Sequence, residues 1–137
     1  MIRIPKYWTK AKKHLSKKDK KIAKLIKNYQ SPSETILTSR RDIFFSLCKS
    51  IIGQQISVVA ANSVFSKFKK KCNYKINAKK VSKLTFKQLK SCGLSRQKVL
   101  GIKSLAKQIL DKSFNPKLIS KMSDEDAISY LSNLRQI

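Results

Sequence analysis

Acidic side chains are scarce in this 137-residue sequence, which has 7 Asp and Glu against 32 Lys and Arg and a formal net charge of +25. A field of that sign attracts polyanions, and nucleic acid is the commonest polyanion. The alternative is that the many lysines reflect AT-rich coding sequence and have no specific partner. An anionic membrane is a weaker candidate, because no long basic amphipathic helix ends in Trp or Phe.

Histidine is also rare, since His14 is the only one, and a histidine-based metal site or catalytic triad therefore has no basis. The three cysteines, Cys48, Cys72 and Cys92, lie far apart and form no CxxC pair. We expect buried, reduced thiols in a cytoplasmic, nucleoid-associated protein. No glycine-rich loop has the spacing of a nucleotide-phosphate site, and we expect neither a metal nor a cofactor.

Long hydrophobic runs are missing, although the hydrophobic share is 41%. No run reaches the ~18 apolar residues that a membrane span needs. The charges of Arg3 and Lys6 are not followed by an apolar core, so we expect no signal peptide and no membrane. The length is that of one domain or a piece of one.

Glycine and proline are few, three of each, and no stretch alternates apolar and polar residues over the length of a strand. The sequence therefore predicts an all-α fold. We expect a single partial domain over residues 1–137, with N-terminal helices in 8–30 and a helical core in 40–137.

Residues suited to helix N-caps mark where these helices should begin. The expected starts are Ser16, Asp42, Ser57, Thr85, Ser95 and Ser123. Gly53 is expected to stop the helix that begins near Asp42, because glycine adopts the left-handed C′ conformation at little cost. The sequence Asn115-Pro116 should interrupt the chain before the last helix.

The segment IIGQQISVVAA, residues 51–61, places two adjacent glutamines at the joint of two apolar helices. A stop at Gly53 and a start at Ser57 would leave Gln54, Gln55 and Ile56 in a tight turn. An amide donates and accepts hydrogen bonds without net charge, so it can enter a base stack without the cost of burying a charge. Two alternatives stay open, an ordinary polar turn and one continuous bent helix, in which Gly53 would cost only ~1 kcal/mol.

Four cationic side chains are candidate phosphate contacts: Arg40, Arg41, Arg96 and Lys98. The alternative for each is an ordinary solvated charge. Together with Gln54, Gln55 and Ser57, they are the candidate DNA-binding residues.

Several segments, taken in order, resemble a known family. They are residues 7–8, 14–16, 42–47, 51–58, 60–61, 92–98, 122–126 and 134–137. The sequences IIGQQIS and GLS-x-x-K are fairly specific in combination. The chain resembles the bacterial DNA-3-methyladenine glycosylase II group of the helix-hairpin-helix (HhH-GPD) base-excision glycosylases.

This resemblance implies a helical bundle of the HhH-GPD type that flips an alkylated purine out of double-stranded, alkylation-damaged DNA. In the wider superfamily, the residue at the second glutamine position fills the gap left by the flipped nucleotide. Gln55 is accordingly the candidate wedge, with Gln54 beside it at the minor groove and Ser57 holding the joint.

The resemblance also implies a Gly-x-Gly hairpin after Leu-Arg-x-Ile and, beyond it, a catalytic aspartate that supports departure of the base. The printed sequence ends at Ile137, and none of its acids matches that aspartate, so no catalytic residue is assigned. We expect an inactive N-terminal portion of a glycosylase, truncated before the hairpin. A non-catalytic DNA-binding module and a structural protein without a specific partner remain the alternatives.

Overall fold

The computed structural model describes residues 6–29 and 42–135, and every regular element in these two ranges is helical. The all-α prediction is therefore confirmed. Contacts divide the chain into two units, Met1–Arg41 and Asp42–Ile137. The expectation of a single partial domain stays a prediction. No helix in the described ranges combines the length and the apolar character needed to cross a membrane.

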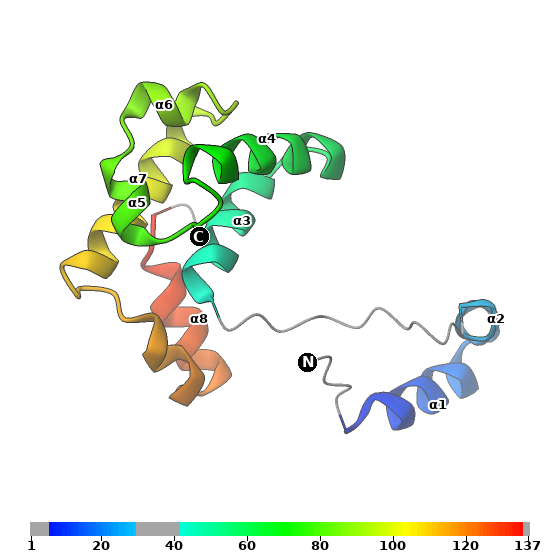
Figure 1. Cartoon of the computed structure of the whole chain (residues 1–137). Coiled ribbons are helices and arrows are strands. Elements are labelled where there is room, and N and C mark those ends of the chain that lie inside the picture. The colour runs from blue at the N-terminus through cyan, green and yellow to red at the C-terminus, as the bar shows by residue number, and fades with distance from the viewer. Residues whose placement is uncertain (1–5, 30–41, 136–137) are drawn as a thin grey trace. The chain divides into compact units, whose positions relative to one another are not determined.

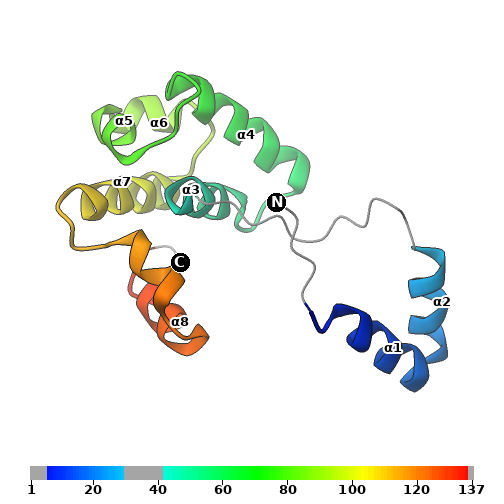
Figure 2. The same ribbon diagram turned by 60° about the horizontal axis from the view of Figure 1, so that its bottom comes forward.

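The first unit contains α1 (Trp8–Lys18) and α2 (Lys20–Asn28), which pack against each other (Figure 2). The predicted helix start at Ser16 is wrong, because Ser16 lies inside α1. Instead, the Asp19 carboxylate accepts hydrogen bonds from the amides of Lys21 (2.7 Å) and Ile22 (3.1 Å). A charged acceptor suits the positive end of a helix better than a hydroxyl does, and the break falls where Asp19 provides it.

The second unit is arranged around α3 and α7, which contact each other (Figure 1). Its elements are α3 (Ile43–Gly53), α4 (Val58–Lys71), α5 (Ala78–Lys83), α6 (Phe86–Lys90), α7 (Arg96–Leu110), the 3-10 helix η1 (Pro116–Lys121) and α8 (Asp124–Ser132). Helix α3 contacts both α4 and α7, α5 packs on α7, and α6 contacts α7 and α4.

Side-chain caps begin the helices of this unit as predicted. Asp42, Ser57, Thr85, Ser95 and Ser123 each accept a hydrogen bond from an amide of the following turn. Thr85 also forms the expected capping box with Gln88. Helix α5 was not predicted: it has only six residues, too few to show a hydrophobic period.

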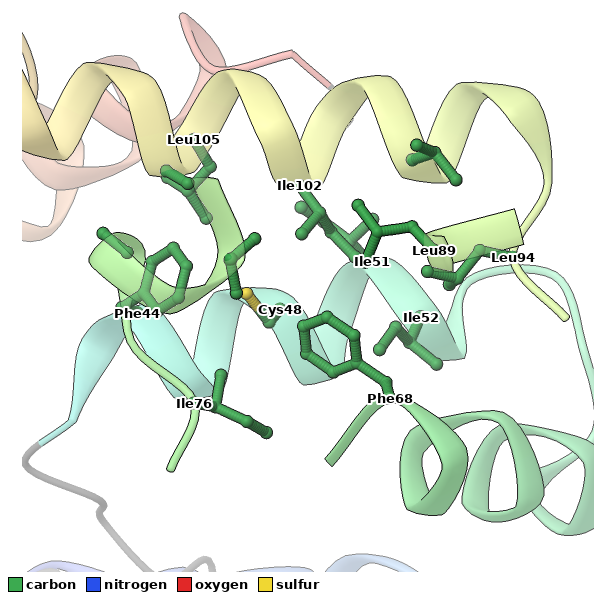
Figure 3. Packing of buried hydrophobic residues seen from close by; sticks show 14 of the residues in the cluster. Phe44, Cys48, Ile51, Ile52, Phe68, Ile76, Leu89, Leu94, Ile102 and Leu105 are labelled. Atoms are coloured by element: carbon green, nitrogen blue, oxygen red, sulfur yellow. The ribbon is translucent and has the colours of Figure 1, made fainter. Parts of the chain in front are cut away.

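The core lies between α3, α4 and α7 and is built from aliphatic residues, phenylalanines and cysteines (Figure 3). Ile51 and Ile52 of α3, Phe68 of α4 and Ile102 of α7 are fully or almost fully buried. Burying one such side chain stabilises the fold by ~1.5–3 kcal/mol. This packing fixes the end of α3 relative to the start of α7, and that junction carries the candidate site.

The three cysteines are free and buried, as expected from the sequence. Burial disfavours the charged thiolate and raises the pKa of all three, that of Cys72 to about 11. These side chains therefore pack as small apolar groups.

Some lysines stabilise the fold by donating hydrogen bonds to backbone carbonyls at helix ends. The ammonium of Lys80 donates to the Cys72 carbonyl oxygen (3.2 Å) at the end of α4. Lys103 donates to the carbonyl oxygens of Leu84 (2.6 Å) and Ser82 (3.4 Å) at the end of α5. The last carbonyls of a helix have no intrahelical partner and carry partial negative charge, so a cation there stabilises the helix end.

Candidate nucleic-acid interface

Four residues, 54–57, connect α3 to α4, and the backbone changes direction sharply at Gln55. Gln54 has φ −59° and ψ 132°, whereas Gln55 has φ +56°, in the left-handed region. The alternative of one continuous bent helix is therefore wrong. The predicted stop of the helix at Gly53 is confirmed, because α3 ends there, but the left-handed conformation expected for this glycine is wrong: Gln55 adopts it instead.

A side chain from another helix bonds to the backbone at this joint. The Lys98 ammonium, on α7, donates to the carbonyl oxygens of Ile52 (2.8 Å) and Gln54 (2.7 Å). The Ile52 carbonyl lies in the last turn of α3, where the helix offers it no partner, and the Gln54 carbonyl belongs to the joint.

The exposed tip of the joint is uncharged. Gln55 is exposed. Three apolar side chains near it are also exposed to solvent: Ile56 to 41%, Val58 to 76% and Val59 to 80%. A non-glycine residue in the left-handed conformation costs roughly 1–2 kcal/mol. Asn73, Tyr74 and Lys112 have positive φ as well, so the distinctive feature of Gln55 is its exposed place between α3 and α4.

Ser57 ends the joint by starting α4. Its hydroxyl oxygen accepts a hydrogen bond from the Ala60 amide (3.2 Å) while its own backbone stays extended. The remaining amides at the N-terminus of α4 are free of intrahelical partners and lie at the positive end of the helix dipole. This geometry suits a phosphate near the joint.

The approach to α7 depends on Gly93, whose φ is +96°. A Cβ placed there would lie 3.1 Å from the Val64 side chain on α4. After this turn, Ser95 caps α7 by accepting from the Lys98 amide (3.3 Å). The GLS-x-x-K segment therefore has a physical function: it delivers Lys98 to the end of α3.

The structure brings together four of the seven predicted DNA-binding residues, Gln54, Gln55, Ser57 and Lys98. Arg96 is exposed in the first turn of α7, two positions before Lys98. Arg40 and Arg41 lie outside the described residues. No observation here tests DNA contact by any of the seven, so those roles stay predictions.

Sequence reasoning missed two features of this site. It considered Lys98 as a phosphate contact or an ordinary solvated charge, because spacing gives no sign of a bond between residues 44 positions apart. It also passed over Val58 and Val59, although a signal was present. Neither valine belongs to the inner face of α4, and consecutive apolar residues off that face indicate an exposed apolar patch.

The acids of the described ranges have local structural roles. Asp19 and Asp42 cap helices, and the acids of residues 124–126 occupy the first turn of α8. Asp111 accepts from the hydroxyl and the amide of Ser113, and these bonds lower the pKa of its carboxyl group. No group of three or more His, Cys, Asp or Glu in this part of the chain could hold a metal ion. None of these acids is therefore assigned a catalytic role.

The class of protein to which this all-helical unit belongs is given by a family match. Residues 48–135 match the family described as HhH-GPD superfamily base excision DNA repair protein. That match covers more than half of the chain, and the chain belongs to this superfamily.

Two curated relatives come from Schizosaccharomyces pombe. The chain is 27% identical to DNA-3-methyladenine glycosylase 1 over 135 residues, and 28% identical to alkylbase DNA glycosidase-like protein mag2 over 134 residues. The alignments cover 94% and 95% of this chain but 58% and 62% of the relatives. The chain thus spans about three fifths of the length of either protein.

Solved structures share the fold. The S. pombe 3-methyladenine DNA glycosylase Mag1, solved in complex with abasic DNA, superposes with a TM-score of 0.77 and 25% identity, over 93% of this chain and 64% of that one. The DNA-3-methyladenine glycosidase of Bacillus halodurans gives a TM-score of 0.69 and 18% identity, over 74% of this chain and 48% of that one. The predicted HhH-GPD fold is thereby confirmed.

Proposed function

We propose that this chain is the wedge-bearing part of a base-excision glycosylase that cleaves the N-glycosidic bond of alkylated purines, of the 3-methyladenine type, in double-stranded DNA. The observation that carries the proposal is the exposed, left-handed Gln55 between α3 and α4. The names of the two yeast relatives and the abasic DNA in the Mag1 structure support the choice of substrate.

The joint has the properties that a wedge needs. Flipping a nucleotide costs a few kcal/mol of stacking and pairing. An amide that enters the gap recovers part of this cost through hydrogen bonds to base edges, and it does so without a buried charge. The exposed side chains of Ile56, Val58 and Val59 can pack on the deoxyribose beside it.

The electrostatic surroundings favour DNA as well. No Asp or Glu occurs between Asp42 and Asp111, whereas lysines occur throughout this stretch. The joint lies within this acid-free stretch, so phosphates that approach it meet no carboxylate from the stretch. They also face the positive end of the α4 dipole. We propose that Arg96 contributes a phosphate contact.

Excision itself requires a carboxylate that stabilises the positive charge developing on the sugar. The acids of the described ranges are occupied in caps and local turns. We therefore propose that the 137-residue chain binds damaged duplex DNA without releasing a base. A cytoplasmic, nucleoid-associated location is part of the same proposal, in keeping with three free cysteines.

The test is duplex binding measured by fluorescence anisotropy, with one duplex carrying a central tetrahydrofuran abasic analogue and a matched intact duplex. We expect the chain to prefer the abasic duplex by at least about tenfold, or ~1.4 kcal/mol, and Gln55→Ala to remove most of this preference. Asn133→Ala, which removes an exposed amide at the end of α8, is the control and should keep it. Equal affinity of the unmodified chain for both duplexes would contradict the proposal.

A second assay addresses catalysis. Methylated duplex DNA is incubated with the chain, and released 3-methyladenine is measured by chromatography. We expect no release above the spontaneous rate. Release above that rate would make the chain an enzyme in its own right and would overturn its assignment as a binding portion.

A further inference from the structure

We propose that Lys98 is a positioning residue that holds Gln55 in its DNA-facing conformation and is not a phosphate contact. This inference rests on the proposed function and changes the role that the sequence suggested for Lys98. It starts from two hydrogen bonds, from one ammonium to the carbonyl oxygens of Ile52 and Gln54.

The second of these bonds acts directly on the wedge. The carbonyl of Gln54 belongs to the peptide plane that joins Gln54 to Gln55. The orientation of this plane sets ψ of Gln54, 132°, together with φ of Gln55, +56°. A donor 2.7 Å from the carbonyl oxygen resists rotation of the plane. Lys98 thereby opposes relaxation of the left-handed turn to one of the less costly regions open to glutamine.

The first bond, to the Ile52 carbonyl, anchors this turn to α3. The Ile52 carbonyl lies in the last turn of α3, where it has no intrahelical partner. A single ammonium that joins Ile52 and Gln54 ties the turn to a helix whose Ile51 and Ile52 side chains are buried in the core. The Gln55 amide therefore projects from a rigid base, as a wedge that must displace a stacked nucleotide requires.

The same bonds argue against a primary role in phosphate binding. An ammonium has three donors, and two of those of Lys98 are used by backbone oxygens. The Lys98 side chain is also half-buried. A solvated lysine at the surface would gain more from a phosphate, because it would not have to leave existing partners.

Helix α7 offers a matched control. Lys103 is half-buried as well, and its ammonium also donates to two carbonyl oxygens, those of Leu84 and Ser82. Its target is the end of α5 and not the joint. Lys103→Met therefore removes the same charge and the same kind of contact from the same helix.

The first experiment needs no DNA. Chemical shifts of the Gln55 backbone, measured by NMR in the 137-residue chain, report the left-handed conformation. We expect Lys98→Met to shift or broaden the Gln55 signals, whereas Lys103→Met leaves them unchanged. Unchanged Gln55 signals in a folded Lys98→Met variant would overturn the inference and would not contradict the proposed function.

The second experiment uses the abasic and intact duplexes over about 50 to about 200 mM salt. We expect Lys98→Met to lower the preference for the abasic duplex at least about tenfold, with the same salt dependence as the unmodified chain. Lys103→Met should keep the preference. If Lys98→Met weakens binding to both duplexes equally and reduces the slope of log K against log salt by about 0.9, Lys98 is a phosphate contact and the inference fails. Equal binding of both duplexes by the unmodified chain identifies a failure of the proposed function instead.

If Lys98→Met does not fold, Lys98→Arg decides between the same two roles. Arginine keeps the charge, so a phosphate contact would be fully preserved. A guanidinium is bulkier and holds its donors in a fixed planar fork, so it meets the two carbonyls with altered geometry and a positioning role predicts a partial loss of abasic preference. Full retention of that preference would overturn the inference.

Discussion

The ammonium nitrogen of Lys98 lies 2.7 Å from the backbone oxygen of Gln54, across 44 positions of sequence. This contact joins the start of α7 to the turn that carries Gln55. It also changes how the high net charge is understood, because Lys80, Lys98 and Lys103 all bond to backbone carbonyls at helix ends. Part of the lysine excess therefore maintains the fold.

Replacing Gln55 by glycine should separate stability from binding. Glycine adopts φ +56° at little cost, although it adds entropy to the unfolded chain, so we expect the free energy of unfolding to rise by up to about 1 kcal/mol. Preference for the abasic duplex should fall, because the amide is gone. Thermal denaturation and anisotropy measure the two effects.

Tyr74→Gly is the matched control for that variant, since Tyr74 is exposed and has φ +60° after α4. It should keep its preference for abasic DNA and show a smaller gain in stability, because it also loses the contact of the Tyr74 ring with the Lys69 ammonium, 5.9 Å from the ring centroid. A loss of stability in Gln55→Gly would mean that its side chain makes contacts worth more than the strain.

The two glycines that flank this region should respond in opposite ways to alanine. Gly93→Ala combines a φ of +96° with a contact of 3.1 Å to Val64, and we expect it to cost about 1–3 kcal/mol. At Gly53 nothing lies within 4 Å of an added Cβ, and the residue is helical, so Gly53→Ala should be neutral or stabilise by up to about 1 kcal/mol. Urea denaturation distinguishes the two, and equal costs would contradict this explanation.

Removing the cap of α4 should affect both folding and binding. Ser57→Ala loses the hydrogen bond to the Ala60 amide and should cost about 0.5–2 kcal/mol. It should also weaken binding to the abasic duplex, because the N-terminus of α4 adjoins Gln55.

Ser123→Ala removes the equivalent cap of α8, where Ser123 accepts from the Asp126 amide. We expect a comparable loss of stability in urea and no change in DNA affinity. Equal effects of the two variants on binding would show that affinity follows general stability and does not depend on the joint.

Alkaline pH should destabilise the fold through the buried thiols. Burial raises the pKa of Cys72 to about 11, above the ordinary value of 9.0 that it regains on unfolding. Below pH 9 the thiol is protonated in both states and its contribution to stability is fully present. Between about pH 9 and 11 only the unfolded chain loses the proton, so the free energy of unfolding should fall.

Urea denaturation at pH 8 and pH 10 measures this effect. The raised pKa values of Cys48 and Cys92 act in the same direction. The same burial predicts slow labelling by a thiol reagent at pH 8 until the protein unfolds. Rapid labelling of all three cysteines in the folded protein would contradict their placement in the core.

Much of the fold could be predicted because its signals are local. Serine, threonine and aspartate caps act on amides within the next turn, and each of the five predicted starts from Asp42 onward was confirmed. The error at Ser16 arose where two acceptors compete within one turn and the charged one, Asp19, prevails. Helix α5 was missed because its six residues depend on packing against α7.

The sequence by itself determined the helical class, the starts of the core helices, the basic charge and the presence of two glutamines at a helix joint. These properties depend on composition and on interactions within a few residues. Only the tertiary structure decided that Gln55, and not Gly53, is left-handed. The donor that bonds to this joint, Lys98, belongs to α7 and reaches the joint only because Ile51, Ile52, Val99 and Ile102 are buried in one core.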